Sequence, residues 1–430
     1  MKLFFKKALS YILIIESRLV LLKYKPKIVA ITGSVGKTGT KDAVFAVISG
    51  VAYVRKSEKS YNSEIGLPLT ILGCPNGWNN PYIWFRNILK GIWLFLAPHK
   101  YPKWLILEVG VGKPEDMQRT ASWLKTDAVI ITAIGKTPVH IEFFDSRKHL
   151  IDEKSELIKT LKKDGLLILN ADDDAVLEMK TKTKNRTITY GFKEEADITG
   201  SGESIFYDDI GIPRGIIFRA DEGGNSLPVV IEKVFGQNHI YASLASLALS
   251  FGLKLNMINA IGALKNYDIS PGRMCLVNGI NNSLIIDDTY NSSPSACEAA
   301  LKTLGMIKTS GRKIAVLGDM LELGRYTKET HENIGKIARE NCEILAVVGQ
   351  RAGDIKAGAV EAGMRAENIP EFLNSVEAGE YMKDLVKMND LILVKGSQGI
   401  RMERTVLAIL ANKENKKKLL VRQDKEWQSK

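Results

Sequence analysis

The chain has 430 residues, of which 45% are hydrophobic and 25% are charged. This is the composition of an ordinary soluble globular protein, and the length predicts two or three domains with a sizeable core. The 36 glycines and 13 prolines exclude a collagen-like or low-complexity chain. No apolar run reaches the ~18 residues that a membrane-spanning helix requires.

The formal net charge of +11 is concentrated at the two ends of the chain. Residues 1–27 contain seven Lys or Arg and one Glu, and residues 412–430 contain seven Lys or Arg and three acidic residues. A nucleic-acid-binding protein usually carries its basic patch on a folded domain, so we expect no nucleic-acid partner. Basic ends suit loosely ordered tails or an acidic membrane surface.

Residues 3–22 are expected to form a basic amphipathic helix. Glu16 and Arg18 interrupt its apolar run and no small-residue cleavage site follows, which argues against a signal peptide. Periodicity does not decide whether the apolar face packs on the chain's own core or lies on a membrane. The four cysteines lack CxxC spacing, which predicts free thiols in a reducing cytoplasm and neither a zinc site nor a redox pair.

Short apolar strands alternate with helical patterns in the first part of the chain. The expected strands are KIVAITG (27–33), WLILEVG (104–110), AVIITAIG (128–135) and GLLILNAD (165–172). Such strands, separated by helices, predict a parallel sheet that is buried on both faces. The aromatic-rich stretch 77–104 predicts a helical hairpin packed on the core, with peripheral membrane attachment as the alternative.

The pattern changes between residues 186 and 235, where the alternating runs TITYGF, GIIFRA and LPVVIE predict a small antiparallel meander. A helix follows at HIYASLASLALSFGL. After the Pro-Gly linker, a second strand series predicts another parallel α/β domain: LIIDD (284–288), KIAVLGD (313–319), ILAVVG (344–349) and LILVKG (390–396). We expect four segments: a basic N-terminal segment at 1–27, a central domain at 28–270, a C-terminal domain at 271–411 and a basic tail at 412–430.

The strongest local motif is a glycine-rich segment between the first strand and a helix, which is the setting of a phosphate-binding loop. It reads Gly33, Ser34, Val35, Gly36, Lys37, Thr38. Gly33 and Gly36 let the backbone curl so that N–H groups face phosphate oxygens. Lys37 adds a positive charge and Thr38 offers a hydroxyl to Mg²⁺. Ile31 replaces the first glycine of the full motif, so this is a shortened variant.

Because the loop predicts a nucleotide with its metal, three further residues become candidates for the same site. Glu108 ends a strand, where a carboxylate points into the ligand crevice of a parallel sheet, and Mg²⁺ takes one or two carboxylates beside phosphates. His140 follows the strand at 128–135, and Lys154 lies in the helical segment EKSEL. Taken alone, His140 is typical of a surface or packing histidine, and EKSEL of an exposed salt-bridged helix face.

Together these motifs resemble the Mur ligases of peptidoglycan synthesis, most of all the MurF type. In chain order they are TGSVGKT, YNSEIGLPLTIL, LEVG, HIEFFDS, EKSEL, PGR, DDTYNSSPSA, VLGDMLELG and KGSQGIRME. The resemblance runs from about residue 28 to about residue 405. It implies an α/β fold, in which a P-loop ATPase central domain with a parallel sheet and a small antiparallel meander precedes a Rossmann-like C-terminal domain.

The resemblance also implies an activity and its cofactors. The enzyme would be a cytoplasmic, monomeric, ADP-forming ligase that uses ATP and two Mg²⁺ ions. It would add D-alanyl-D-alanine to a muramoyl-tripeptide precursor through an acyl phosphate. Two alternatives stay open: a related ligase for a different or lipid-linked carboxylate, and a non-catalytic, membrane-associated nucleotide-binding scaffold. Retention of Lys37, Glu108, His140 and Lys154 argues against the scaffold.

Residue roles follow from the resemblance. The loop from Gly33 to Thr38 would hold the ATP phosphates, and Thr38 and Glu108 one Mg²⁺. His140 and Lys154 would hold the second Mg²⁺, with Lys154 carbamylated, because a bare ammonium would repel the metal. Lys37, His140 and Lys154 would be the catalytic residues.

The remaining predicted contacts involve residues that follow Lys154 in the sequence, with Asn62 as the exception. Arg273 would contact the γ-phosphate, Asp288 the ribose and Asn238 the adenine, and the C-terminal domain would close over the nucleotide. The expected substrate contacts are Asn62, Tyr290, Asn291, Lys395, Gly396 and Ser397.

The sequence departs from the family pattern at three places. In Gly236-Gln237-Asn238-His239 the usual order of His and Asn is exchanged, and Ala242 replaces a later Asn. Ser63 stands where Asn is common. Only 27 residues precede the first strand, which is too few for an independent core. We therefore expect the usual uridine-binding N-terminal domain to be absent.

Overall fold

The computed structural model describes residues 2–57, 61–135, 143–424 and 427, with the side chains of residues 2–6 excepted. The chain divides into two compact units. Unit 1 comprises Met1–Ser201, Arg219–Val229 and Asn238–Asp268, and unit 2 comprises Gly202–Phe218, Val230–Gln237 and Ile269–Lys430. None of the helices in the described ranges has the length and hydrophobicity that crossing a bilayer requires.

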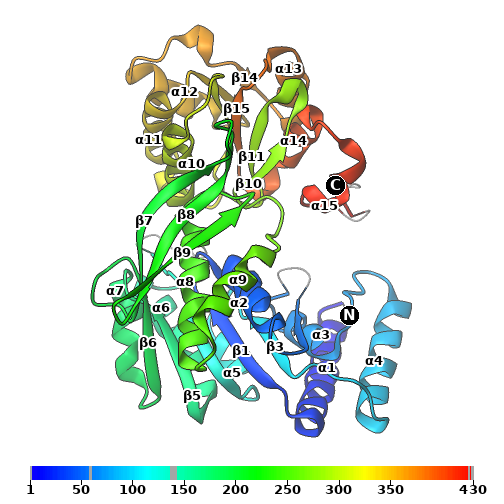
Figure 1. The fold of residues 1–430 in the computed structure, drawn as a ribbon. Helices are drawn as coiled ribbons and strands as arrows, with labels where there is room; N and C mark the ends of the chain where they lie inside the picture. Colours follow the sequence, from blue (N-terminus) through cyan, green and yellow to red (C-terminus); the bar gives the residue numbers. More distant parts are fainter. Residues whose placement is uncertain (1, 58–60, 136–142, 425–426, 428–430) are drawn as a thin grey trace. The chain divides into compact units, whose positions relative to one another are not determined.

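The first sheet has nine strands in the order β2-β3-β1-β4-β5-β6-β7-β8-β9 (Figure 1). The strands are β1 (Lys27–Thr32), β2 (Val54–Lys56), β3 (Trp104–Glu108), β4 (Thr126–Ile131), β5 (Leu161–Asn170), β6 (Arg186–Gly191), β7 (Ile198–Tyr207), β8 (Pro213–Glu222) and β9 (Asn225–Glu232). The helices of this half are α1 (Lys2–Tyr24), α2 (Lys37–Ser49), α3 (Gly66–Leu72), α4 (Pro81–Leu96), α5 (Asp116–Ala121), α6 (Arg147–Ser155), α7 (Asp174–Leu177), α8 (Gln237–Gly252) and α9 (Met257–Ala263).

The strands from β2 to β7 all pair in parallel, as the apolar runs predict. One detail of the predicted meander is wrong. The run TITYGF forms β6, which pairs in parallel with both β5 and β7 and so belongs to the main sheet. The strands β7, β8 and β9 follow one another in chain order, and the short connections between them suit antiparallel neighbours.

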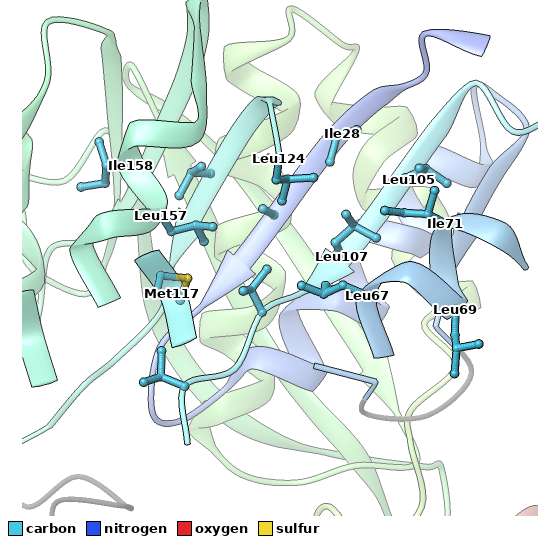
Figure 2. Close-up of a cluster of buried hydrophobic side chains, with 14 of the residues drawn as sticks. Ile28, Leu67, Leu69, Ile71, Leu105, Leu107, Met117, Leu124, Leu157 and Ile158 are labelled. Atoms are coloured by element: carbon cyan, nitrogen blue, oxygen red, sulfur yellow. The ribbon is translucent and has the colours of Figure 1, made fainter. Parts of the chain in front are cut away.

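Alternating strand residues pack one face of this sheet into a large core. Figure 2 shows Ile28 of β1 with Leu105 and Leu107 of β3, facing Leu67 and Ile71 of α3. These side chains are at most 3% exposed. Because successive residues point to opposite faces, the intervening positions face the other side, where α2 packs. Burial on both faces explains why the strands are continuously apolar.

The stretch 77–104 contains one helix, α4, so the predicted helical hairpin is wrong. Asn80 caps the N-terminus of this helix, and its side chain accepts hydrogen bonds from the backbone N–H groups of Tyr82 and Ile83. It packs beside α1, and α1 also packs on α3 (Figure 1). Helix α1 confirms the helix expected at 3–22, and Leu13 and Val20 bury its inner face in the unit 1 core.

Unit 2 contains the second sheet, in the order β10-β11-β15-β12-β13-β14. Its strands are β10 (Cys275–Asn278), β11 (Leu284–Asp288), β12 (Lys313–Gly318), β13 (Ile344–Val348), β14 (Glu371–Phe372) and β15 (Leu391–Lys395). Its helices are α10 (Pro294–Met306), α11 (Thr327–Asn341), α12 (Ala352–Glu361), α13 (Ser375–Leu385), α14 (Glu403–Ile409) and α15 (Lys416–Leu419). Except for β10, which is antiparallel to β11, the strands pair in parallel, and this confirms the predicted α/β class.

The basic tail is more ordered than its composition predicts. Leu420 is 2% exposed in the core of unit 2. Arg422 donates hydrogen bonds to Glu403 Oε2 at 3.0 Å and to the Thr289 carbonyl at 3.1 Å. The expectation of a loosely ordered tail is therefore wrong for the segment around these two anchors.

Candidate active site

The phosphate-binding loop lies between β1 and α2, as predicted. Gly33 has φ +144° and Gly36 has φ +86°, a range that L side chains rarely adopt. A Cβ atom at Gly33 would also lie 2.0 Å from Thr132 Oγ1, so the end of β4 leaves room only for glycine. The N–H groups of Ser34 and Val35 donate to the Ala133 carbonyl, at 2.8 and 3.0 Å. Amides for a phosphate would therefore come from Gly36 and the start of α2.

The side chains of Thr38 and Glu108 meet beside this loop. Glu108 is the register partner of Ile31, so the last residue of β3 lies next to the end of β1. Thr38 Oγ1 donates to Glu108 Oε2 at 3.0 Å, and both residues are buried. Neighbouring oxygens in an octahedral Mg²⁺ shell are also about 3 Å apart. Asn62 Nδ2 donates to the other oxygen, Glu108 Oε1, at 3.2 Å.

This donor set fits Mg²⁺ only as part of a nucleotide complex. In the part of the chain that the structure describes, no three His, Cys, Asp or Glu side chains gather as they do at a protein-only metal site. One carboxylate and one hydroxyl leave most of an octahedral shell to phosphate oxygens and water, which is how Mg²⁺ is usually held at nucleotide sites.

The structure also contains a buried ion-pair network beside Glu108, which the sequence analysis does not predict. Lys41 Nζ lies 3.8 Å from Glu108 Oε2 and 3.7 Å from Asp42 Oδ1, and Lys56 Nζ lies 2.6 Å from Asp42 Oδ1. Lys41, Asp42 and Glu108 are each at most 2% exposed. The available signal was the spacing of Lys41 from Lys37, since residues four apart lie on the same side of a helix.

Lys154 approaches the same loop from α6. Its Nζ donates to the Gly33 carbonyl at 3.1 Å, and Lys37 Nζ donates to that same carbonyl at 2.8 Å. Burial, with a further effect of the Lys37 ammonium, lowers the pKa of Lys154 to about 7. Lys154 thus lies beside the phosphate loop, and its carbamylation and metal-binding role stay predictions. His140 lies outside the described residues.

A cavity of about 810 Å³ opens in unit 1 beside the loop, at the carboxyl ends of β4 and β5. Gly36, Thr132, Asn170, Asn238 and Tyr241 are among its lining residues. Its size lies within the usual range for small-molecule sites.

The exchanged Asn and His of the GQNH motif have separate environments. Asn238 lines the cavity. His239 is 4% exposed, and its Nδ1 lies 3.1 Å from Tyr267 Oη. Asn238 is therefore the member of the pair that is placed for a ligand, while His239 packs in the interior.

Asp288 and Lys395 form a partly buried ion pair in unit 2. They are register partners at the ends of β11 and β15, and Lys395 Nζ lies 2.6 Å from Asp288 Oδ2. Lys395 is 2% exposed and also donates to the Asn291 carbonyl at 2.9 Å. The Lys395 ammonium thus faces the carboxylate that is predicted to contact the ribose, and the roles of both residues stay predictions.

The remaining predicted residues surround this pair. The Arg273 guanidinium stacks over the Tyr290 ring, 3.9 Å from its centroid. Ser397 Oγ accepts from the Leu321 N–H at 2.9 Å and donates to the Ser292 carbonyl at 3.3 Å. A Cβ at Gly396 would lie 2.7 Å from Met402 Cγ. Unit 2 thus brings together the predicted residues Arg273, Asp288, Tyr290, Asn291, Lys395, Gly396 and Ser397.

Comparison with known families matches two parts of the chain. Residues 88–249 match the Mur ligase middle domain, and residues 272–398 match the Mur ligase glutamate ligase domain. Together these matches span well over half of the chain.

Individual relatives agree. A Bacillus subtilis protein named UDP-N-acetylmuramoyl-tripeptide–D-alanyl-D-alanine ligase is 26% identical, over 88% of this chain and 75% of its own. A Buchnera aphidicola protein of the same name is 29% identical, over 92% and 79%. The MurF ligase of Thermotoga maritima, solved with ADP, shares the fold with a TM-score of 0.75 at 24% identity, over 93% and 83%. The chain belongs to the Mur ligase family.

Proposed function

We propose that the chain is an ATP-dependent, Mg²⁺-requiring ligase that adds D-alanyl-D-alanine to the peptide carboxylate of a muramoyl-tripeptide precursor of peptidoglycan. The observation that carries this proposal is the Thr38–Glu108 pair, buried beside a phosphate loop in a chain of the Mur ligase family. The curated relatives described above bear the name of this activity.

The reaction balances in two steps. An oxygen of the acceptor carboxylate attacks the γ-phosphorus of ATP, ADP leaves, and an acyl phosphate forms. The amine of the dipeptide then attacks the acyl carbon, loses a proton, and expels inorganic phosphate to leave an amide. Such transfers depend on positioning and charge neutralisation more than on a protein nucleophile.

Each loop residue has a defined task in this proposal. The backbone at Gly36 and the start of α2 bind the phosphates, and Lys37 neutralises their charge. Thr38 and Glu108 would hold one Mg²⁺, which would supply positive charge to the nucleotide phosphates. Asn62 orients Glu108 through its 3.2 Å hydrogen bond. Asn238 lines the cavity where we place the adenine.

We also propose that Lys154 is carbamylated and, with His140, holds a second Mg²⁺. Carbamylation joins the neutral amine to CO₂ and releases one proton. A pKa of about 7 keeps much of Lys154 in that neutral form near neutral pH. The Lys37 charge that disfavours the Lys154 ammonium would stabilise the anionic carbamate.

Arg273 and Asp288 belong to unit 2, whereas the phosphate loop belongs to unit 1. The proposed contacts of Arg273 with the γ-phosphate and of Asp288 with the ribose therefore require both units to act on one nucleotide. For Asp288 the carboxylate must serve the ribose while it stays paired with Lys395. Tyr290, Asn291, Lys395, Gly396 and Ser397 then stabilise the dipeptide side of the site.

The test is ADP release by the purified chain with candidate acceptors, with and without D-alanyl-D-alanine. We expect release only when ATP, Mg²⁺, the muramoyl tripeptide and the dipeptide are all present. Turnover with a different or lipid-linked carboxylate alone would favour the related-ligase alternative. ATP binding without turnover on any acceptor would favour the scaffold. We place the reaction in the cytoplasm, because the four free, buried cysteines suit a reducing compartment, and the monomeric state stays a prediction.

A further inference from the structure

The outer face of α4 is apolar although it faces solvent. Tyr82, Phe85, Leu89, Ile92, Trp93 and Leu96 are between 44% and 71% exposed. They recur every three or four residues, which places them on one side of the helix. The opposite side carries the buried residues Trp84, Asn87, Gly91 and Leu94. Monomeric soluble proteins rarely expose apolar stripes of this length without a partner.

Helix α1 has the same character on its outer side. Tyr11, Ile15 and Leu22 are between 39% and 69% exposed, whereas Leu13 and Val20 on the inner side are fully buried. The outer side of α1 therefore combines exposed apolar side chains with exposed basic ones such as Lys7 and Arg18. We call the exposed residues of these two helices the α1–α4 face.

The two helices are fixed to each other, so the face is preformed. Lys23 Nζ at the end of α1 donates to the carbonyls of Leu94, Phe95 and Ala97 at the end of α4, at 2.6–3.0 Å. A Cβ at Gly91 would lie 2.2 Å from Glu16 Oε2, so glycine permits close packing of α4 on α1. Figure 1 shows the pair at one side of unit 1, together with α3.

The charges on the α1–α4 face have one sign. Among the described side chains, the exposed basic residues are Lys7, Arg18 and Lys23 of α1 and Arg86 and Lys90 of α4. The ammonium groups of Lys23 and Lys90 also donate to backbone carbonyls. Helix α4 contains no acidic residue, and the only one in α1 is Glu16. Glu16 is 7% exposed and points toward α4 rather than to solvent. The face therefore offers cations and apolar groups without a solvent-exposed carboxylate.

The combination of basic and apolar groups indicates which kind of partner covers the α1–α4 face. A second copy of the chain, paired through the same face, would bring these cations against one another. A bilayer with anionic headgroups matches both properties, because lipid buries the apolar stripe while phosphates meet the cations. Tyr82 and Trp93 are residue types that prefer the membrane–water interface.

We propose that the α1–α4 face binds peripherally to an anionic lipid bilayer. This goes beyond the proposed ligase function and does not depend on it, since no residue of the face belongs to the phosphate loop or its cavity. Binding would hold unit 1 at the membrane surface.

The test is co-sedimentation of the full chain with vesicles of phosphatidylcholine alone and of phosphatidylcholine mixed with phosphatidylglycerol, without nucleotide. We expect binding to the mixed vesicles only, weakened by high salt, because salt screens exposed charges. Arg18→Gln with Arg86→Gln should lower the partition coefficient roughly thirty-fold, from the contribution of two basic residues near an anionic surface. Phe85→Ser with Trp93→Ser should lower it by about tenfold or more.

A matched control is Ile210→Ser with Leu373→Ser, which removes two apolar side chains that are each 80% exposed elsewhere. It should bind as the unaltered chain does. Circular dichroism of every variant checks folding, and all replaced side chains are exposed. No binding to mixed vesicles, or equal binding by the face variants and the control, would overturn the proposal. So would a lipid-free dimer that the Phe85 and Trp93 replacements dissociate, since the face would then join two copies.

Discussion

The carbamate proposed at Lys154 makes a prediction that separates it from an ordinary buried lysine. An ordinary lysine with a pKa of 10.5 is neutral in about one molecule in a thousand at about pH 7.5. With a pKa of about 7, about three quarters of Lys154 is neutral at the same pH. The structure therefore raises the concentration of the form that reacts with CO₂ by nearly three orders of magnitude.

The perturbation is Lys154→Ala, with Lys159→Ala as the matched control. Lys159 lies just beyond the end of α6, and its side chain is 70% exposed. We expect Lys154→Ala to lower ADP release by about 10²- to 10³-fold, the usual cost of removing one charge-stabilising group from an active site. Short-chain carboxylic acids should partly restore turnover, because they supply the missing anionic oxygen. Lys159→Ala should be fully active.

A direct readout comes from ¹³C-bicarbonate, which should give a carbamate signal in the NMR spectrum of the unaltered chain. The signal should be lost in Lys154→Ala and kept in Lys159→Ala. Wild-type activity should fall in CO₂-depleted buffer and return with bicarbonate. The reasoning is refuted by full activity of Lys154→Ala, or by a carbamate signal that survives that replacement.

Three further predictions follow from the same geometry. Lys37→Ala should lower ADP release by about 10²-fold or more with an unchanged melting temperature, because Lys37 is the first residue of α2 and is only half buried; near-normal turnover would contradict the ligase proposal. Thr38→Val should raise the Mg²⁺ concentration for half-maximal turnover by at least the ~10-fold typical of a lost outer-shell partner, whereas Thr38→Ser, which keeps the hydroxyl, should not. Burial raises the pKa of Glu16 from 4.5 to about 7, so the folded chain holds this proton more tightly and stability falls as the pH rises through that window. Glu16→Gln should therefore stabilise the chain by up to about 3 kcal/mol above pH ~7 and much less near pH ~5, and equal melting shifts at both pH values would count against this.

The sequence predicts the parallel sheets because their strands carry the signal themselves. KIVAIT and WLILE are buried on both faces, and that burial demands continuous apolar runs. Whether two strands pair in parallel or antiparallel gives no such signal in the sequence of either strand. The alternation in TITYGF is the same whether β6 meets its neighbours in parallel or not, so its place in the main sheet depends on distant strands. Strands of two or three residues, such as β14 and β2, fall below any periodicity signal.

In the candidate site, too, local features could be predicted from the sequence and long-range contacts could not. The phosphate loop is local, since Gly33 and Gly36 are required by backbone angles within six residues. The pair Asp288–Lys395 joins positions 107 residues apart, and only the register of β11 with β15 brings them together. The sequence does not predict the contacts of the tail either, because the burial of Arg422 depends on the distant carboxylate of Glu403.

The charges around Glu108 affect whether Mg²⁺ would bind alone or together with a nucleotide. Lys41 and Lys56 offset the two carboxylates of Glu108 and Asp42, so this buried group is close to neutral before any ligand binds. The loop in front of it adds the positive charge of Lys37. A bare divalent cation that entered here would meet Lys41 within a few ångströms of its own ligand and would gain little net attraction. The phosphates of a nucleotide would reverse that balance, because they would bring several negative charges to the loop. On the proposed function, the site would accept Mg²⁺ together with the nucleotide, and Glu108 would orient the complex. Lys41 would then hold the Glu108 carboxylate in place between turnovers, through the ion pair at 3.8 Å.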